Sequence, residues 1–209
     1  MDILQNNQPM FATLILAAGK SSRMGVPKWS LAFDRHQTFV EHLIQVSQRA
    51  GSKEIIVVVN IEDQKLFDKH FSKFPMGVKW VINEHPEWER FYSLQLGLRP
   101  LMQPLPVLVC NIDHPFLEVT TIQTLLSLKN KTDYAVPTYQ NQGGHPILIS
   151  NTIVQDVLKT AEPQIHLKTF LQKYTQARIA VQDPRILSNI NTPEDYLHYF
   201  PKVKAFSNL

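Results

Sequence analysis

The sequence predicts an α/β domain built around an open, mostly parallel β-sheet of about seven strands. Three observations lead to this fold class. Strand-like and helix-like segments alternate along the 209 residues, no internal repeat interrupts them, and several strand-like segments are apolar runs of the kind found in strands covered on both faces. At 44% hydrophobic and 19% charged residues, the chain is long enough to bury a substantial core.

Four strand-like segments lie in the first half of the chain. Residues 13–16 form an apolar run, and residues 55–59 form a continuous β-branched run that is typical of a strand buried on both faces. We expect a short third strand at residues 78–82. Residues 106–112 are almost entirely apolar, which predicts that the fourth strand is central in the sheet.

Helices are expected between these strands. Thr38 can cap a helix that runs to residue 50, and Glu41 stands three residues later, as a capping box requires. We expect a second helix around residues 63–71. A third covers residues 88–99, and the proline that follows it ends the helix.

The second half of the chain continues the alternation, and the carboxyl ends of its strands are expected at the edge where α/β sheets bind ligands. In chain order we expect a helix at residues 121–128, strands at 134–137 and 145–149, a helix capped by Asn151 that runs to about residue 160, a helix at 165–174, a strand at 177–181, and a terminal helix over 193–199 that starts with Pro193 after the cap Thr192.

Composition excludes several classes of function. The formal charge is only +3 and the basic residues form no block, so nucleic acid is not an expected partner. No apolar run approaches the roughly 20 residues of a membrane span, and the first nine residues lack a signal-peptide pattern. Cys110 is the single cysteine, which excludes an internal disulfide and a thiolate zinc site. We therefore expect a cytoplasmic protein with a small anionic ligand and no membrane partner.

Residues 11–28 are the most informative segment, because an apolar strand stops at Gly19 and is followed by hydroxyls and cations. Glycine allows torsions that a side chain would forbid, and successive N–H groups in such a loop form an anion-binding concavity. Arg23 can fork two phosphate oxygens, and Lys28 adds a mobile charge. A P-loop is excluded, since it needs a glycine where Leu14 stands. The segment predicts a nucleoside triphosphate site in preference to a solvated turn.

Two polar residues further along the chain are expected to reach the same edge of the sheet. Asp113 directly follows the predicted central strand, where a carboxylate can bind Mg²⁺ or simply cap the next turn. Next to the phosphate loop, magnesium binding is the better interpretation. Asn191 precedes the last helix and offers a neutral oxygen for a metal or a ribose. His145, at a strand entrance, can hold a second anionic substrate, although an isolated histidine is more often structural.

One helix carries a small face. Ser93 and Gly97 are four residues apart and therefore lie on one side of the helix expected at residues 88–99. Such a face either lets a nucleotide base approach the helix backbone or allows tight packing against a neighbour. The residues alone do not decide between these two interpretations.

The motif LAAGKSSRMGVPK at residues 16–28 resembles the signature of the molybdenum cofactor guanylyl- and cytidylyltransferase-like (MobA-like) NTP transferases. Five further segments agree with that family in the same order, so that the resemblance spans residues 11–200. They are TFVEHL at 38–43, the region 83–98, IDHPFL at 112–117, GHPILIS at 144–150 and NINTPEDY at 189–196.

The resemblance implies a Rossmann-like three-layer α/β/α sandwich of the nucleotide-diphospho-sugar transferase type. It divides the chain into a flexible segment at residues 1–10, a single nucleotidyltransferase-like domain at 11–200 and a tail at 201–209. The implied activity is transfer of an NMP unit from an NTP, with CTP or GTP expected, to a small phosphorylated acceptor, with Mg²⁺ as cofactor and pyrophosphate as product.

The resemblance also implies roles for individual residues. Leu16, Ala17, Ala18 and Gly19 would contact the base and ribose, with Asn83 and Ser93 near the base. Arg23 and Lys28 would hold the triphosphate. Asp113 and Asn191 would bind the metal, and His114 and His145 would contact the acceptor. Asn191 stands where relatives carry aspartate or asparagine, and Arg90 lies near a position where many relatives carry glycine.

Two alternatives stay open beside this reading. The acceptor can be a sugar or polyol phosphate, or the chain can be a catalytically silent nucleotide-binding sensor or chaperone. The residues that select the acceptor are expected at 35–37, 139–144 and 162–166, where no pattern identifies the ligand. The oligomeric state is not predicted.

Overall fold

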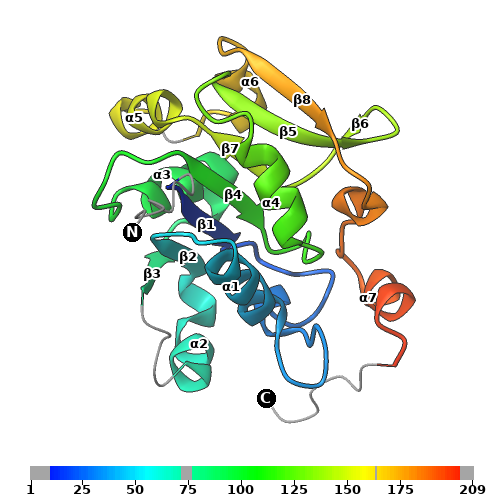
Figure 1. Cartoon of the computed structure of the whole chain (residues 1–209). Coiled ribbons are helices and arrows are strands. Elements are labelled where there is room, and N and C mark those ends of the chain that lie inside the picture. The colour runs from blue at the N-terminus through cyan, green and yellow to red at the C-terminus, as the bar shows by residue number, and fades with distance from the viewer. Residues whose placement is uncertain (1–9, 72–76, 163, 203–209) are drawn as a thin grey trace, which may run out of the picture.

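The structure is a computed structural model of the chain that describes residues 10–71, 77–162 and 164–202. The expected flexible segment at residues 1–10 lies outside the described residues except for Met10, and the expected tail lies outside them except for residues 201 and 202. The helices and strands between Ala12 and Tyr199 are arranged around a single β-sheet (Figure 1).

The predicted α/β class and the mostly parallel sheet are confirmed. In the part of the chain that the structure describes, the sheet has eight strands in the order β3-β2-β1-β4-β7-β5-β6, with β8 paired to β5. The strands are Ala12–Ala17 (β1), Ile55–Asn60 (β2), Val78–Asn83 (β3), Val107–Asn111 (β4), Tyr134–Tyr139 (β5), Gln142–Gly143 (β6), Ile147–Ile149 (β7) and Gln176–Ala180 (β8).

The register of the sheet brings the ends of β1 and β4 together. β1 pairs in parallel with β2 and with β4, and Leu16 lies opposite Asn111. β3 continues this parallel set, and β8 is parallel to β5, whereas β7 runs antiparallel to β4 and β5. The carboxyl ends of β1, β2, β3 and β4 therefore meet at one edge, where the last residue of β1 is followed by the loop that the sequence singles out.

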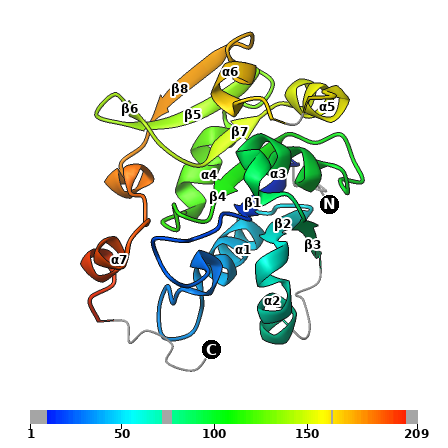
Figure 2. The same cartoon turned by 180° about the vertical axis from the view of Figure 1, so that it is seen from behind.

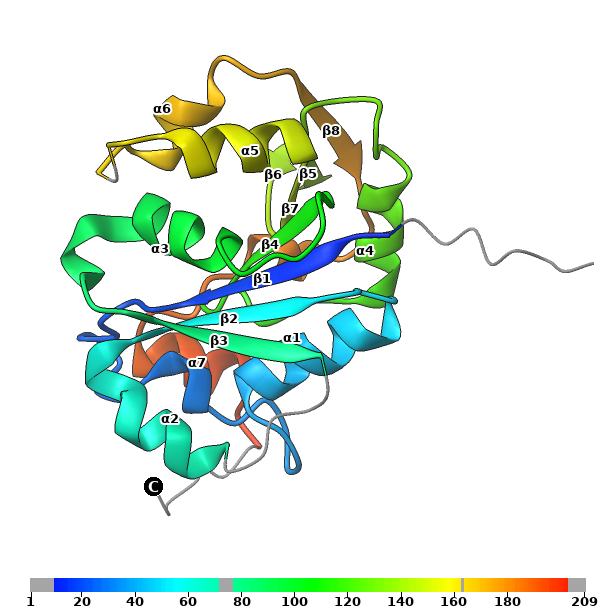
Figure 3. The same ribbon diagram turned by 90° about the vertical axis from the view of Figure 1, so that its left-hand side faces the viewer.

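Helices cover both faces of the sheet and make the predicted three layers. Figure 3 shows α3, α5 and α6 on one side and α1, α2 and α7 on the other. The helices are Phe39–Arg49 (α1), Gln64–His70 (α2), Glu89–Leu98 (α3), Val119–Leu126 (α4), Asn151–Lys159 (α5), Leu167–Leu171 (α6) and Pro193–Tyr199 (α7), with 3-10 turns at Lys28–Ser30, Ile61–Asp63, Pro86–Trp88 and Pro184–Leu187.

Two separate hydrophobic clusters result from the alternation of side chains along the strands. Ile15 and Val57 pack on the face of α1, α2 and α4, whereas Leu14, Leu16 and Val58 pack on the face of α3, α5 and α6. Both faces of the central strands are thus buried, which explains why the sequence shows continuous apolar runs there. Cys110 is buried in the first cluster, and burial raises the pKa of its thiol.

Helix caps follow the sequence closely, with one correction. Thr38 caps α1 in a complete capping box with Glu41, as predicted. Thr192 caps α7 with Pro193 in the first turn, also as predicted. The expected cap Asn151 is wrong: Ser150 caps α5 by accepting from the backbone of the third helical residue. Either residue type can cap, and only the position at which the chain turns helical decides between them.

The region between β5 and β8 differs most from the prediction. β7 covers only three of the five residues expected at 145–149, and β6 is a two-residue strand that the sequence does not signal. α6 is a single short helix, Leu167–Leu171, where ten helical residues were expected.

Among the described residues, no helix combines the length and the apolarity that a membrane span needs.

Candidate active site

A cavity of about 750 Å³ opens at the carboxyl ends of β1 and β4, on the face covered by α3 and α6. It is large enough to enclose a drug-sized ligand. Its lining includes residues that the sequence predicts for nucleotide binding, for metal binding and for acceptor binding. They are Leu16, Ala18, Gly19, Lys28, Ser93, Asp113 and His145.

Other predicted residues do not line this cavity. Ala17 faces the opposite side of the sheet and packs in the cluster of α1, because successive strand residues point to alternate faces. Arg23 is exposed beside the cavity. Asn83, His114 and Asn191 lie directly behind lining residues, as their contacts below show.

The loop after β1 turns sharply at two positions. Ser21 and Gly25 have φ angles of 49° and 77°, and the backbone N–H groups of Met24 and Gly25 both donate to the carbonyl of Ser21. The hydroxyl of Ser21 accepts from the backbone N–H of Lys28 at 3.2 Å. Ser21 therefore closes the loop on itself and fixes the position at which Lys28 leaves it.

Gly19 acts in a different way from the one predicted. Its φ angle does not lie in the left-handed region, so the torsional argument made from the sequence is wrong for this residue. A Cβ atom built at Gly19 would meet no atom within 4 Å. Glycine at this position therefore leaves the backbone open toward the cavity, and Gly25 carries the left-handed turn.

Trp29 anchors the residue that precedes it. Its ring is fully buried, packs edge-on against Phe67 with centroids 4.9 Å apart, and donates from Nε1 to Asp63 at 3.3 Å. Because Lys28 and Trp29 share a rigid 3-10 turn, burial of the indole holds the backbone of Lys28 at the rim of the cavity.

Lys28 contacts a residue near the far end of the chain. Its Nζ donates to Oδ1 of Asn191 at 2.6 Å, a contact between residues 163 positions apart. Burial lowers the pKa of Lys28, and the nearby Arg23 and Arg90 lower it further, whereas the charge of Asp113 opposes the shift. The side chain thus lies among charges of both signs.

Asn191 is held by the capping box of the terminal helix. Its backbone N–H and that of Thr192 both donate to Oδ2 of Asp195 at 2.9 Å. These two hydrogen bonds lower the pKa of Asp195. The amide of Asn191 is therefore fixed at a helix terminus, and its oxygen keeps a second lone pair beside the hydrogen bond from Lys28.

Asp113 has the properties of a cation ligand. Its Oδ1 is buried and has no hydrogen-bond partner among the described residues, and the ring of His114 is 3.8 Å away. Its backbone carbonyl accepts from Ile190 at 2.8 Å, which brings the segment before Asn191 against it. A buried carboxylate oxygen without a donor is unfavourable unless a cation or a ligand donor satisfies it.

No cluster of three or more histidine, cysteine, aspartate or glutamate side chains suited to a metal occurs among the residues with described positions. A cation at Asp113 would therefore take most of its ligands from water and from a bound substrate. Magnesium commonly binds in this way, through one or two carboxylates and the phosphates of its nucleotide.

Two histidines pack together behind Asp113. The rings of His114 and His145 have centroids 4.3 Å apart. Nδ2 of Asn111 lies 3.1 Å from Nδ1 of His145, and because an amide nitrogen only donates, the ring nitrogen accepts. Burial lowers the pKa of His145 to about 3, with His114 and Arg90 adding to the effect. His145 is therefore neutral at physiological pH.

Asn83 at the end of β3 and Ser93 in α3 form a buried pair. Nδ2 of Asn83 donates to the hydroxyl of Ser93 at 2.9 Å, and Oδ1 accepts from the backbone of His85. Gly97 on the same helix face serves close packing, since a Cβ atom there would overlap Leu14 and would lie 2.7 Å from Cγ2 of Val58. The small face is therefore explained by packing at Gly97, while Ser93 lines the cavity.

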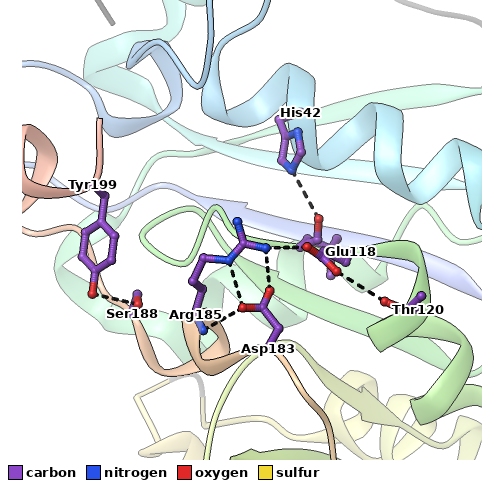
Figure 4. A network of polar contacts seen from close by, with 8 residues as sticks. His42, Glu118, Thr120, Asp183, Arg185, Ser188 and Tyr199 are labelled. Carbon is purple, nitrogen blue, oxygen red and sulfur yellow. Dashed lines mark hydrogen bonds and ion pairs between the residues drawn. The ribbon is translucent and has the colours of Figure 1, made fainter. Parts of the chain in front are cut away.

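Figure 4 shows the network that ties the segment before Asn191 to the rest of the molecule. Arg185 binds both carboxylate oxygens of Asp183 at 2.9 Å and also reaches Glu118 at the start of α4. Ser188 donates to the hydroxyl of Tyr199 at 2.9 Å. This clamp positions the chain that carries Asn191 beside Asp113.

Sequence reasoning missed several residues that line the cavity. Asn111 is the last residue of β4, and a polar residue at the carboxyl end of an apolar strand was a usable signal for it. Lys168 and Gln176 gave no signal, because they come from the irregular region around α6 and β8. Of the three segments expected to select the acceptor, Gly143, Gly144 and 165–166 line the cavity, and 35–37 does not.

Comparison with known proteins gives a consistent result. The model of the MobA-like NTP transferase domain matches residues 13–178. No curated protein sequence matches the chain.

Solved structures share the fold at low sequence identity. Rv0371c from Mycobacterium tuberculosis is 21% identical with a TM-score of 0.74 over 93% of this chain and 100% of that one. A nucleotidyl transferase from Methanothermobacter is 21% identical with a TM-score of 0.72 over 91% and 95%. The 4-diphosphocytidyl-2C-methyl-D-erythritol synthase of Anaerococcus prevotii is 14% identical with a TM-score of 0.68 over 94% and 100%. Rv0371c has also been solved in complex with manganese.

Proposed function

The chain belongs to the MobA-like NTP transferase domain family and is a nucleotidyltransferase, and we propose that it transfers an NMP unit from a metal-bound NTP to a small phosphorylated acceptor. The acceptor would be a molybdopterin-type cofactor or a chemically similar molecule, and pyrophosphate would be released. CTP and GTP are the proposed donors.

One observation carries this proposal. The cavity at the carboxyl ends of β1 and β4 places Lys28 near a buried carboxylate oxygen of Asp113 that has no hydrogen-bond partner among the described residues. A cation from the phosphate loop and an anion suited to a metal are the two elements that an NTP needs from a protein.

The reaction needs no protein nucleophile. An oxygen of the acceptor phosphate attacks the α-phosphorus of the NTP, a new P–O bond forms, and the α–β anhydride bond breaks with its electron pair leaving on pyrophosphate. Lys28 would neutralise charge that develops during this exchange, with Arg23 holding the outer phosphates from the exposed side of the loop. Positioning two polyanions against their repulsion is the main task of the site.

The remaining roles follow from position. Backbone groups of residues 16–19 would contact the base and ribose where Gly19 leaves the loop open. The Asn83–Ser93 pair lies on the α3 side of the same cavity and would contact the base. His145, supported by His114, would contact the acceptor through neutral ring nitrogens.

The donor set fits a divalent ion. Asp113 supplies a free buried oxygen, and Asn191 has a second lone pair on an oxygen already held by Lys28. When bound, Mg²⁺ would act as a Lewis acid that neutralises the phosphates of the NTP. The manganese complex of Rv0371c supports a site for divalent ions in this fold.

A second candidate acceptor is a polyol phosphate. The structural similarity to a 4-diphosphocytidyl-2C-methyl-D-erythritol synthase favours it. This candidate keeps the same nucleotide site and differs only in the half of the cavity that receives the acceptor.

Pyrophosphate release tests the proposal. Each of the four common NTPs would be incubated with Mg²⁺ or Mn²⁺ and with molybdopterin or 2-C-methylerythritol 4-phosphate as acceptor. We expect release that requires the divalent ion, one preferred NTP and one acceptor. Tight NTP binding without release from either acceptor would favour the sensor, and absence of NTP binding would contradict the assignment of the site.

A further inference from the structure

The cavity extends well beyond the residues proposed to hold the triphosphate. In Figures 1, 2 and 3, which differ only by turns about the vertical, α6 lies above α3 and the end of β1 lies below it. The same cavity is lined by Lys28 from the loop after β1 and by residues of α6. The cavity therefore extends from the loop after β1 to α6.

The α6 end has an apolar wall. Six side chains form it, contributed by α3, β5, β7 and the segment that enters and includes α6: Phe91, Val136, Ile147, Ile165, Leu167 and Leu171. Phe91 is only 1% exposed and Leu171 only 7%, and both belong to the hydrophobic core on this side of the sheet. Phe91 and Leu171 are thus core residues, whereas Ile165 and Leu167 are partly buried and pack against that core.

Cationic and donor groups stand at the far end of this wall. His166 and Lys168 line the cavity beside Leu167, and both are exposed. Nδ1 of His166 accepts from the backbone of Lys168 at 3.3 Å, so the ring carries its proton on Nε2, which remains a donor. No salt bridge engages Lys168 within the described parts of the chain.

We propose that the acceptor is a phosphorylated molecule with an apolar body and a second anionic group at its other end. Its phosphate would lie near Asp113 and His145, its body would lie along the apolar wall, and its second anion would meet Lys168 and His166. This inference rests on the proposed nucleotidyl transfer to a phosphorylated acceptor, and it replaces the polar pterin of a molybdopterin-type cofactor with an apolar body at the same site.

The wall argues against a polyol body. Each hydroxyl of a polyol loses water on entering the cavity and needs a replacement hydrogen bond, and the six wall residues offer none from their side chains. An apolar body gains instead from every methylene removed from water, at about fourfold in affinity for each one. The cavity also has polar side chains beside the wall, from Arg90, Tyr134 and Gln176, but the six wall side chains themselves offer no hydrogen bond to a hydroxyl.

Binding of simple phosphates tests the body of the acceptor. The enzyme would be saturated with Mg²⁺ and the α,β-methylene analogue of its preferred NTP, and butyl, pentyl and hexyl phosphate would be titrated by calorimetry. We expect the dissociation constant to fall about fourfold for each added methylene. Glycerol 3-phosphate and ribitol 5-phosphate should bind at least tenfold more weakly than hexyl phosphate.

A matched pair of variants locates the effect. Leu167→Gln should flatten the dependence on chain length, whereas Leu158→Gln, at a partly buried leucine that packs on the same core but does not line the cavity, should leave it unchanged. Thermal unfolding of both variants shows whether each remains folded.

The second anion has its own test. 4-Carboxyphenyl phosphate should bind more tightly than phenyl phosphate, and Lys168→Gln should reduce this preference roughly two- to fivefold without changing the affinity for phenyl phosphate. Lys159→Gln, an exposed lysine outside the cavity, should change neither.

The failure of this inference is distinguishable from the failure of the proposed function. Tighter binding of the polyol phosphates, no dependence on chain length, or no binding of any of these phosphates by an enzyme that binds the NTP analogue would overturn the inference alone. Loss of NTP binding itself would contradict the proposed function, and the alkyl phosphates would then be titrated against the nucleotide-free enzyme.

Discussion

At the scale of single residues, Lys28 and Asp113 are the pair on which the proposed chemistry depends. Lys28→Met and Asp113→Asn should each lower turnover by about 10²–10³, because one removes the charge facing the phosphates and the other removes the charge facing the metal. The melting temperature should stay close to that of the wild type. Pyrophosphate release under saturating substrate provides the measurement.

Lys20→Met is the matched control for Lys28. Lys20 is exposed in the same loop and does not line the cavity, so its loss should leave turnover within about twofold. Near-normal pyrophosphate release by Lys28→Met would show that the cation of the loop has no catalytic role.

The buried side chain of His42 should make the stability of the protein depend on pH. Its ring stacks on Phe33, and Nε2 lies 3.3 Å from the carbonyl of Leu117. Burial lowers its pKa to about 4; the contact to Leu117 and the charge of Asp34 oppose this shift, while Arg185 and Arg49 add to it.

Because the pKa is lower in the folded state, the unfolded chain binds more protons, and stability falls as the pH drops from about 6.5 toward 4. Between pH 7 and pH 5 the free energy of unfolding should fall by about 2 kcal/mol more in the wild type than in His42→Gln. Urea unfolding at both pH values measures this difference. Equal losses in the two proteins would mean that folding does not lower the pKa of His42.

At the scale of elements, α3 packs against β1 and β2 through Gly97. Gly97→Ala should destabilise the protein by about 1–2 kcal/mol, since the overlap with Leu14 and Val58 outweighs the better helix propensity of alanine. Urea unfolding checks this value, and an unchanged midpoint would mean that α3 can move away from the sheet without cost.

Gly19→Ala is the contrasting substitution, because open space surrounds the added methyl. Its free energy of unfolding should stay within about 0.5 kcal/mol of the wild type. The KM for NTP should rise, since the methyl would occupy the place where the backbone is proposed to approach the ligand. An unchanged KM would remove Gly19 from the nucleotide site.

A second prediction about the elements concerns the contacts of Arg185 that Figure 4 shows. Arg185→Met breaks the contacts to Asp183 and Glu118, which are partly exposed and contribute only about 1 kcal/mol of stability. Turnover should fall by about tenfold or more, because the segment that carries Asn191 loses its attachment to α4.

Steady-state kinetics and thermal unfolding separate the two effects. Arg185→Lys keeps the charge but loses the forked geometry, and it should recover only part of the turnover. Arg99→Met, at an exposed arginine at the end of α3, serves as the control. Full activity of Arg185→Met would show that the capping box and the contacts to Lys28 and Asp113 position Asn191 without Arg185.

At the scale of the whole molecule, the ligand should stabilise the complete domain. The lining of the cavity runs from the loop after β1 to Gln176 in β8, and Lys28 in that lining donates to Asn191 in the segment before α7. An NTP with Mg²⁺ at 100 times its dissociation constant should add about 2.7 kcal/mol to the free energy of unfolding, which raises the melting temperature by about 5–10 °C. Addition of EDTA should reverse most of this shift. A shift in melting temperature that persists after addition of EDTA would argue against a metal-bound NTP.

The class of the fold could be predicted from the amino-acid sequence. Continuous apolar runs at residues 55–59 and 106–112 required strands buried on both faces, and such strands require helices on both sides of a sheet. The cap at Thr38 was readable because capping depends on neighbours within four residues. Local chemistry of this kind needs no knowledge of distant parts of the chain.

Only the tertiary structure decided how the site is assembled. The sequence does not predict that Lys28 donates to Asn191, because the two residues are 163 positions apart and come into contact only in the folded chain. The exchange of roles between Gly19 and Gly25 depended on backbone torsions that residue type does not specify. The apolar wall of the cavity could not be predicted from the sequence either. Phe91, Val136 and Leu171 have the sequence pattern of ordinary core residues, and only the tertiary structure shows that they line a cavity.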